Sequence, residues 1–382
     1  MFTFNISSKI YFGSGVSKDT GRIAADLGLE KVLCVYDPGI KAAGIAEQIM
    51  SSIEASGLTC SGYGAVIPNP DETSIEEAAE AARSTQVDGI VAVGGGSSID
   101  TAKAVNILLT NPSPIRQYEG SDLVLLNTKP LIAIPTTAGT ASEATDFTVV
   151  TDQARKKKMV IHGKNCCADI ALLDPLLTIK LPPNVTAFTG MDALTHAIEA
   201  FLSKASSPIS DHNALKGISL IYQNLEQAVK NGKEVEVRSN MLLGSLFAGF
   251  AFNSAVLGLV HAIAHPLSAH CGLPHGLANA AVLPYVMSYN AGDASVRKKY
   301  RQIAASMGIE TAKDSDEEAA SRVIKAVAEL CKKVKIPPLR ETGVAKEDFE
   351  TIAIDALNEH SFQFNPRKAN VQDVMAILKQ AY

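Results

Sequence analysis

Residues 90–109 read IVAVGGGSSIDTAKAVNILL, an apolar run followed by three glycines and then by apolar residues at helical spacing. The pattern predicts a buried strand over residues 90–93 and a helix over residues 98–109. Glycines let the backbone approach a diphosphate, and the N–H groups of a helix N-terminus attract anions. We therefore expect a nucleotide-binding turn here, although the G-x-G-x-x-G pattern is absent. The alternative is a tight turn in which Ser97 caps the helix and Asp100 completes a capping box.

The same alternation of β-branched runs and helical patterns extends from the beginning of the chain to about residue 180. The expected strands are residues 32–35, 62–66, 90–93, 131–134 and 171–173, and the expected helices are residues 44–56, 74–85 and 98–109. This alternation is typical of β-α-β units with a mostly parallel sheet. We expect an α/β dinucleotide-binding domain, Rossmann-like, over residues 1–180.

Beyond the Pro182-Pro183 pair the strand patterns nearly vanish and helical patterns continue to residue 382. We expect an all-α C-terminal domain over residues 181–382, with helix breaks at Pro208, Gly232, Pro266, Pro274 and Pro337-Pro338. Residues 240–260 carry no charge and approach the length of a membrane span, but asparagines, serines and glycines interrupt them. A buried helical core beside a polar site is the favoured interpretation.

Composition excludes several classes of protein. The chain has 382 residues, is 46% hydrophobic and has a formal net charge of -5, which argues against disorder and against nucleic-acid binding. Its six cysteines form no dense framework, and the first residues lack the pattern of a secretion signal. We expect a cytoplasmic protein that binds neither nucleic acid nor membrane.

Histidines are concentrated where charge is absent. Residues 239–292 contain no Asp, Glu, Lys or Arg but hold four of the eight histidines, including His261, His265 and His275. Asp192 and His196 lie four residues apart and share one face of a predicted helix. A lone buried histidine is usually a hydrogen-bonded core residue, but this grouping favours a metal site. Nitrogen and oxygen donors without thiolate suit Fe(II), Zn(II), Ni(II) or Mn(II).

Three further segments are candidates for ligand contact. Asp37 ends the predicted strand 32–36, where a carboxylate can accept hydrogen bonds from an adenosine ribose, or can belong to a simple turn. The segment 135–143, PTTAGTASE, follows a buried strand and offers hydroxyl and N–H groups. The basic run 155–158 is more typical of a solvated turn, although one lysine could reach a cofactor.

The motifs, taken in order, resemble those of the iron-containing (group III) alcohol dehydrogenases, the family that includes lactaldehyde reductase and 1,3-propanediol dehydrogenase. The resemblance covers nearly the whole chain. It rests on IYFGSG (10–15), GGGSSID (94–100), PTTAGTASE (135–143), GMDALTHAIEA (190–200), GLVHAIAHPL (258–267), LPHG (273–276) and NPR (365–367). One departure is Ala141, where many members have glycine.

The resemblance implies a dehydroquinate synthase-like architecture, a homodimer or larger homo-oligomer, and two cofactors, NAD and Fe2+, with Zn2+ as the alternative ion. It makes His265 the catalytic residue, beside the substrate and the nicotinamide. The implied metal ligands are Asp192, His196, His261 and His275. The implied NAD contacts are Asp37, Asn69, Gly95, Gly96, Ser97, Thr136, Thr137, Thr140 and Lys158. The positions expected to shape the substrate pocket are Phe147, Phe252, His360 and Ser361.

The expected reaction is hydride transfer between NAD(H) and a small primary alcohol, diol or aldehyde, with His265 relaying the alcohol proton. Alternatives are a reductase of a small aldehyde with a carboxylate or sulfonate tail, and a glycerol dehydrogenase-like enzyme. A metal-dependent hydrolase would leave GGGSSID and Asp37 unexplained, and a non-catalytic metal or nucleotide sensor is the remote alternative. Dehydroquinate synthase itself needs many basic groups for its polyanionic substrate, which the charge-free segment 239–292 does not supply.

Overall fold

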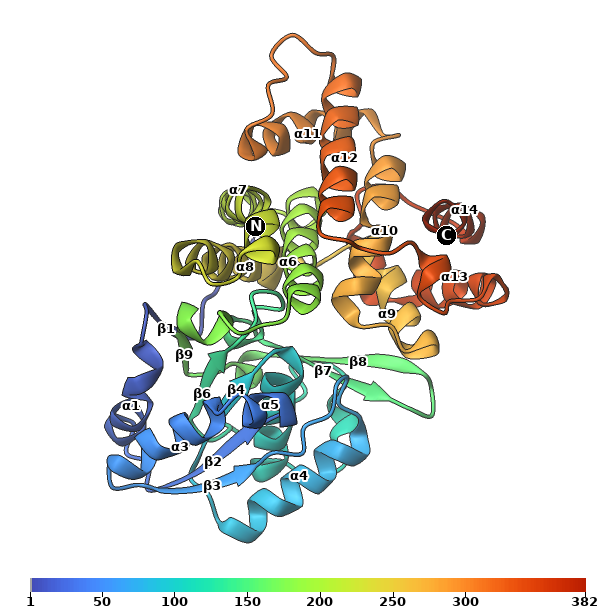
Figure 1. Cartoon of the computed structure of the whole chain (residues 1–382). Coiled ribbons are helices and arrows are strands. Elements are labelled where there is room, and N and C mark those ends of the chain that lie inside the picture. Colours follow the sequence, from blue (N-terminus) through green and yellow to red (C-terminus); the bar gives the residue numbers. More distant parts are fainter. Residues whose placement is uncertain (1) are drawn as a thin grey trace. The chain divides into compact units, whose positions relative to one another are not determined.

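The computed structural model describes residues 2–382 and divides into two compact units. The α/β unit consists of Ile6–Leu181. The helical unit consists of Pro182–Tyr382 together with the described residues that precede Ile6. Figure 1 labels most of the helices and strands of both units.

A six-stranded parallel sheet forms the centre of the α/β unit (Figure 1). Its order is β1 (Lys9–Phe12), β9 (Ile170–Leu173), β6 (Leu131–Pro135), β4 (Gly89–Gly94), β2 (Lys31–Tyr36) and β3 (Thr59–Tyr63). The four inner strands are buried almost throughout because their sequences are continuous apolar runs, as strands covered on both faces require. The edge strand β3 begins three residues before the expected position.

Helices cover both faces of this sheet. Alternate side chains of β2 enter the two cores, since Val32 and Cys34 belong to one apolar cluster and Leu33 and Val35 to the other. The helices that contribute to the first cluster are α1 (Thr20–Asp26) and α3 (Ile45–Ala55); those of the second are α4 (Glu72–Thr85) and α5 (Gly96–Thr110). The expected α/β architecture is confirmed.

The strand order places a topological switch point between β2 and β4. The chain leaves β2 for β3 on one side and returns to β4 on the other side of β2. The segments that follow β2 and β4 therefore diverge at the carboxyl edge of the sheet, where open α/β sheets bind ligands. One of these segments begins with Asp37 and the other contains the three glycines.

A second sheet, which the sequence did not reveal, has the order β5 (Gly120–Ser121), β8 (Lys157–His162), β7 (Phe147–Asp152). Strands β7 and β8 form an antiparallel hairpin. The basic run 155–158 is therefore only partly a turn, because Lys157 and Lys158 belong to β8. Lys158 is buried, so the expectation of a fully solvated turn is wrong for this residue.

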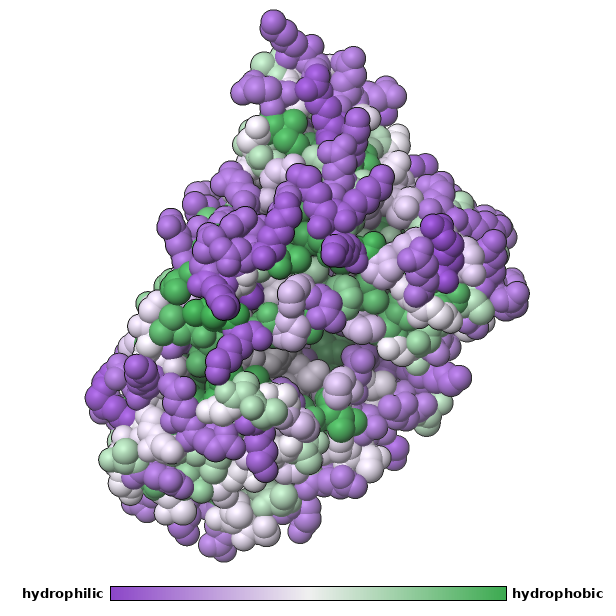
Figure 2. Space-filling model, viewed as in Figure 1, coloured by the Kyte–Doolittle hydropathy of each residue, from purple (hydrophilic) through white to green (hydrophobic). Residues whose placement is uncertain are grey.

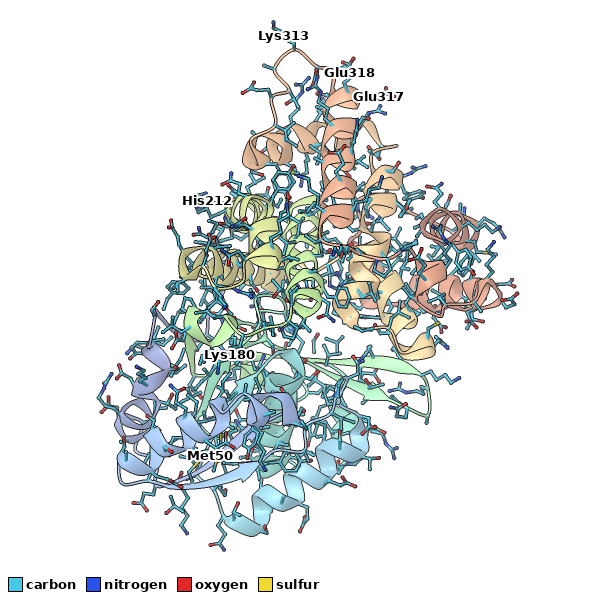
Figure 3. The ribbon with its side chains drawn as sticks, in the orientation of Figure 1. Met50, Lys180, His212, Lys313, Glu317 and Glu318 are labelled. Carbon is cyan, nitrogen blue, oxygen red and sulfur yellow. The ribbon has the colours of Figure 1, made fainter. Side chains whose placement is uncertain are left out.

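The helical unit contains no strand among its described residues. Its α-helices are α6 (Pro183–Leu202), α7 (Pro208–Lys230), α8 (Val235–Ala255), α9 (Leu259–Cys271), α10 (His275–Asn290), α11 (Ala294–Met307), α12 (Asp316–Lys333), α13 (Phe349–Asn358) and α14 (Val371–Ala381). Figure 2 shows hydrophilic side chains over α11 and α12, and Figure 3 shows Lys313, Glu317 and Glu318 at the outer end of this helix pair. The predicted break at Pro266 is wrong, because this proline lies inside α9. A buried helix can lose one backbone hydrogen bond to proline and continue.

The charge-free segment forms most of α8 and the whole of α9 and α10. Gly244 on α8 and Gly217 on α7 bring these two helices close together, since a Cβ on Gly217 would lie 3.1 Å from the carbonyl oxygen of Gly244. A Cβ on Gly244 would lie 2.7 Å from Ile221 Cγ1. Across residues 2–382, no single helix is both long and apolar enough to cross a membrane. The pair α8 and α9 reaches that length and composition only when counted together, and it is bent by 101°.

Gly244→Ala is therefore expected to destabilise the helical unit by about 1–3 kcal/mol, the usual range for overpacking a tight core. Urea unfolding measures this change. Lys216→Ala, an exposed substitution on α7, is the control and should change the free energy of unfolding by less than about 0.5 kcal/mol. Equal stability of the two variants would contradict the close packing of α7 and α8.

Candidate metal centre and nucleotide site

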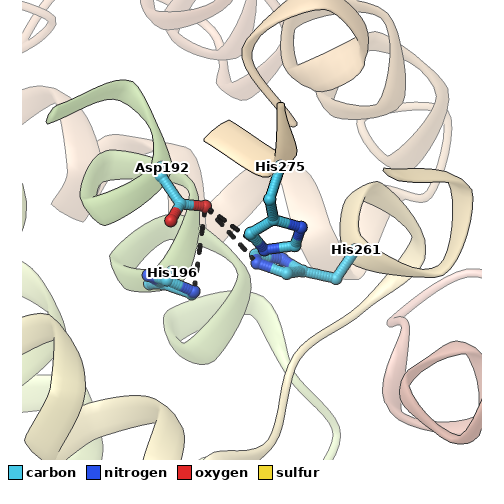
Figure 4. A group of neighbouring side chains, drawn as sticks. All are labelled: Asp192, His196, His261 and His275. Carbon is cyan, nitrogen blue, oxygen red and sulfur yellow. Dashed lines mark ion pairs between the residues drawn. The ribbon is translucent and has the colours of Figure 1, made fainter. Parts of the chain in front are cut away.

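Four potential metal ligands converge in the helical unit (Figure 4). Asp192 and His196 lie one turn apart on α6, His261 is in the first turn of α9, and His275 is the first residue of α10. Asp192 Oδ1 lies 3.9 Å from His196 Nε2, 3.7 Å from His261 Nε2 and 3.7 Å from His275 Nε2. All four donor atoms lie within 4.8 Å of one another.

Local backbone geometry brings the three helices to this point. Val256, between α8 and α9, has φ 59° and ψ -178°, a conformation that non-glycine residues adopt only under constraint. Gly276, the second residue of α10, lies directly against α6, since a Cβ at this position would clash with the carbonyl oxygen of Phe188. The absence of a side chain at residue 276 thus lets His275 reach Asp192.

Most of the cluster is buried, and burial favours the neutral form of His261. Asp192, His196 and His261 are at most 4% exposed. Burial, and after it the neighbouring His196, His275 and His265, lower the pKa of His261 well below its ordinary value. A neutral imidazole keeps the lone pair that a metal ion needs.

The hydrogen bonds of Asn279 indicate whether the four residues fit a metal ion. Its Nδ2 donates to Asp192 Oδ1 at 2.7 Å and also lies 3.0 Å from His261 Nε2 and 3.2 Å from His275 Nε2. An amide nitrogen has two hydrogens, so three acceptors exceed what it can satisfy. Its own Oδ1 is buried, and none of the described residues hydrogen-bonds to it. The cluster therefore has more acceptor lone pairs than hydrogen-bond donors, and its ligands are nitrogen and oxygen atoms with no thiolate. Such a donor set fits a divalent cation such as Fe2+ or Zn2+.

Two buried carboxylates that the sequence interpretation missed contact the histidines of α9. Glu199 lies 2.6 Å from His261 Nδ1, and Glu359 lies 2.8 Å from His265 Nδ1. Burial raises the pKa of Glu199 to about 7. Glu199 could have been found, since it follows Asp192 by seven residues and shares its helix face; Asn279 likewise follows His275 by four. Glu359 gives no such signal, because its partner is 94 residues away in the chain.

The residues expected to contact NAD all lie in the α/β unit, and hydrogen bonds or close contacts join most of them. Asp37 Oδ1 accepts hydrogen bonds from the N–H groups of Gly39 and Ile40, and Asp37 Oδ2 accepts one from Ser98 Oγ at 3.2 Å. Asp37 therefore caps α2 (Pro38–Ala42) and also links the end of β2 to the first turn of α5.

Threonines of the 135–143 segment pack against the glycine turn. A Cβ on Gly95 would lie 3.2 Å from Thr137, and a Cβ on Gly96 would lie 2.7 Å from Thr140. The Thr136 N–H donates to the carbonyl of Gly94 at 3.0 Å. The glycines are thus required by close packing as well as by any approaching ligand.

Ser97, Asn69 and Lys158 form the next part of this site. The Asn69 N–H donates to Ser97 Oγ at 3.4 Å, and Lys158 Nζ donates to Asn69 Oδ1 at 2.7 Å and to Thr151 Oγ1 at 2.9 Å. Burial lowers the pKa of Lys158 to about 8, opposed by the charge of Asp100. A lysine with this pKa is still mostly charged at neutral pH and is suited to an anionic or hydroxyl-rich ligand.

The alternative interpretation, a capping box formed by Ser97 and Asp100, is wrong. Helix α5 begins at Gly96 with Gly95 as its N-cap, and among the described residues no side chain caps it. Asp100 instead accepts hydrogen bonds from Ser142 Oγ at 2.5 Å and from the Val149 N–H at 3.2 Å. Since a glycine N-cap offers no acceptor, the first N–H groups of α5 have no side-chain cap and are suited to a phosphate.

The four residues expected around the substrate come from both units. The Phe252 ring stacks on His196, with ring centroids 4.5 Å apart, so it adjoins the metal cluster. Ser361 is buried with its Oγ unpartnered among the described residues, whereas His360 is exposed and packs edge-on against Phe364. Phe147 belongs to the α/β unit and stacks on His162. Ala141 has φ 51°, in the left-handed region that favours glycine.

A doubly wound α/β unit with a glycine turn at its switch point, in one chain with a helical cluster of one aspartate and three histidines, defines the class of metal-dependent oxidoreductases that use a dinucleotide. Two family models match the chain: "Iron-containing alcohol dehydrogenase" over residues 7–175 and "Fe-containing alcohol dehydrogenase family, C-terminal" over residues 186–382. The chain belongs to the iron-containing alcohol dehydrogenase family, as its motifs predicted.

Individual relatives agree along the full length. The chain is 39% identical to 1,3-propanediol dehydrogenase of Klebsiella pneumoniae, covering 100% of this chain and 99% of that protein. The crystal structure of a 1,3-propanediol oxidoreductase matches with a TM-score of 0.97 at 38% identity, covering all of both chains. Sulfoacetaldehyde reductase of Bifidobacterium kashiwanohense, solved in complex with NAD+, matches with a TM-score of 0.88 at 28% identity and covers 100% and 98% of the two chains.

His275→Ala is expected to remove most bound metal, because it deletes one of the four converging donors. Elemental analysis of the purified protein measures the metal content. His212→Ala is the control, since His212 is exposed on α7, away from the cluster (Figure 3). Full metal content in His275→Ala would contradict the ligand set.

Proposed function

We propose that the protein is an NAD-dependent, iron-dependent alcohol dehydrogenase that interconverts a small primary alcohol or diol with its aldehyde. The observation that carries this proposal is the convergence of Asp192, His196, His261 and His275 within 4.8 Å, in a chain of this family. In this proposal residues 1–180 bind NAD and residues 181–382 hold the metal and the substrate. The proposed setting is the cytoplasm, and the proposed assembly is a homodimer or larger homo-oligomer.

The metal ligands and His265 have distinct roles. A bound Fe2+ ion supplies a Lewis acid for the alcohol oxygen, and NAD supplies the hydride acceptor. Asp192 contributes negative charge, and the three neutral imidazoles contribute lone pairs. His265 accepts the alcohol proton in oxidation and returns it in reduction. Phe252 covers His196 with an apolar ring and keeps water from that side of the cluster.

In the α/β unit the proposed diphosphate site is the start of α5, where Gly95, Gly96 and Ser97 leave backbone N–H groups available. Asp37 accepts hydrogen bonds from the adenosine ribose, and Lys158 binds a ribose hydroxyl or phosphate oxygen. Support for NAD comes from the nucleotide named in the NAD+ complex of sulfoacetaldehyde reductase.

The decisive experiment uses anaerobic, iron-loaded protein, NADH and a panel of aldehydes. The panel includes propionaldehyde, lactaldehyde, 3-hydroxypropionaldehyde and an aldehyde with a sulfonate tail. Loss of NADH absorbance with short neutral aldehydes, abolished by chelation and restored by iron, is the expected result. A response to the sulfonate alone would support the anionic-aldehyde alternative, and no response to any aldehyde would contradict the proposal.

Arg367 is a basic residue that could in principle bind an anionic tail, but its side chain is already engaged. The Arg367 guanidinium stacks on the Tyr289 ring at 4.0 Å and donates to the Tyr289 carbonyl oxygen at 2.5 Å. It is thus engaged within the helical unit, which favours neutral alcohols and aldehydes as substrates.

Asp37→Asn is expected to weaken discrimination against NADPH, because a carboxylate repels the 2′-phosphate and an amide does not. Asparagine can still cap α2, so the turn is preserved. The ratio of kcat/KM for NADPH to that for NADH should rise by roughly 10- to 100-fold, equivalent to about 1.4–2.7 kcal/mol. Asp26→Asn, on the exposed side of α1, is the control. Equal kcat/KM for both cofactors in the unmutated enzyme would argue against this role of Asp37.

His265→Ala is expected to keep its metal while kcat falls by ~10- to 10³-fold, the usual contribution of a positioned acid or base. Added imidazole should restore part of the lost rate. Elemental analysis separates this variant from His261→Ala, which should lose the metal. Metal loss in both variants would make His265 a ligand, and an unchanged kcat would leave it a core histidine.

A further inference from the structure

Helix α9 carries two histidines one turn apart, and each contacts its own buried carboxylate through Nδ1. Glu199 on α6 contacts His261, and Glu359, directly after α13, contacts His265. We propose that these two carboxylates are positioning residues that hold the proton of each imidazole on Nδ1, so that His261 presents Nε2 to the metal and His265 presents Nε2 to the alcohol. This inference rests on the proposed function.

Hydrogen bonds at the cluster fix the position of the His261 proton. The Asp192 carboxylate only accepts hydrogen bonds, so the Asn279 atom 2.7 Å from Oδ1 must be the amide nitrogen. The same nitrogen lies 3.0 Å from His261 Nε2, which is therefore an acceptor without a proton. The single proton of the neutral ring is then on Nδ1, where Glu199 accepts it at 2.6 Å.

Glu199 is held in one place by the beginning of α9. Oε1 accepts the Val260 N–H at 2.6 Å, and Oε2 lies 3.4 Å from the His261 backbone nitrogen. A Cβ on Gly258 would lie 3.0 Å from Glu199 Oε1, so glycine is needed for this close approach. Both carboxylate oxygens face donors, and an amide nitrogen at either position would meet a donor instead of an acceptor.

Glu359 acts on His265 in the same way but leaves the other nitrogen available. Its Oε2 lies 2.8 Å from His265 Nδ1, and the carboxylate side chain is 9% exposed. Among the described residues, none hydrogen-bonds to His265 Nε2. The His265 ring stands at 85° to that of His261, with centroids 6.1 Å apart. In this proposal both histidines carry their proton on Nδ1. They differ in what surrounds Nε2, which faces the metal cluster in His261 and has no hydrogen-bond partner among the described residues in His265.

Glutamine at residue 199 separates this role from simple packing. Glu199→Gln keeps the volume of the side chain, but its amide nitrogen either donates to His261 Nδ1, which moves the ring proton to Nε2, or opposes the Val260 N–H. The first arrangement blocks the metal-binding lone pair, and the second places two donors together. Glu359→Gln replaces the charged acceptor of the His265 proton with a neutral amide, which can also turn its nitrogen toward Nδ1, and it does not touch a metal ligand.

The test compares the metal-free forms of Glu199→Gln and Glu359→Gln with unmutated protein. Co2+ is titrated in and followed by its visible d–d absorption; NADH binding and thermal unfolding are measured in parallel. Glu199→Gln should lose Co2+ affinity by roughly 10- to 100-fold with little change in NADH binding. Glu359→Gln should bind Co2+ normally, with kcat for the iron-loaded enzyme lowered by ~10- to 10³-fold and KM little changed.

Asp355→Asn is the matched control, because Asp355 on α13 contacts a third histidine of α9, His270, at 2.7 Å. This pair lies outside the cluster, so metal affinity and kcat should both stay unchanged. Unchanged Co2+ affinity in Glu199→Gln, or reduced Co2+ affinity in Glu359→Gln, would overturn the proposal.

Imidazole nitrogen NMR of the unmutated, metal-free protein provides a test that needs no variant. Both His261 and His265 should show a protonated Nδ1 and an unprotonated Nε2. A protonated Nε2 on neutral His261 would overturn the proposal even if Glu199→Gln fails to fold. Normal Co2+ binding and the expected tautomers in a protein that oxidises no NADH would contradict the proposed function but not the role of Glu199.

Discussion

Asp192, His196, His261 and His275 direct four electron-pair donors at one buried point, and much of the helical unit is arranged around holding them there. Such donors repel one another unless a cation or a hydrogen-bond donor lies between them. Asn279 supplies a donor, but one amide group cannot satisfy three acceptors. The surrounding features, among them the glycine at residue 276 and the constrained backbone at Val256, keep the donors from moving apart.

Helical spacing made part of this centre predictable. Asp192 and His196 share a helix face at a separation of four residues, so their proximity follows from one helix alone. His261 and His275 became candidates because histidines are rare and four of them lie in a charge-free segment. Their proximity to Asp192 depends on how three helices pack. It was predicted only from the resemblance to a known family. The contact of Glu359 with His265 could not be predicted from the sequence, since only tertiary packing brings the two residues together.

The α/β unit shows a similar division. Continuous apolar runs identified the inner strands, because burial on both faces requires them. The β7–β8 hairpin was missed, since its exposed basic turn outweighed the short β-branched pattern FTVV. Local spacing offered a capping box for Asp100 as the alternative interpretation, but its carboxylate instead accepts hydrogen bonds from Ser142 and Val149. Prediction from local spacing fails here because a buried carboxylate accepts hydrogen bonds from donors that are distant in the chain and that only the complete fold brings close.

The four proposed metal ligands come from three helices and span residues 192 to 275 of the chain. An ion bound there links α6, α9 and α10 much as a covalent crosslink would, and it binds only the folded chain. At a free metal concentration one hundred times the dissociation constant, this linkage adds about 2.7 kcal/mol to the stability of the folded state. The lifetime of the protein against proteolysis is then coupled to metal supply, so that scarcity of iron removes the enzyme as well as its activity.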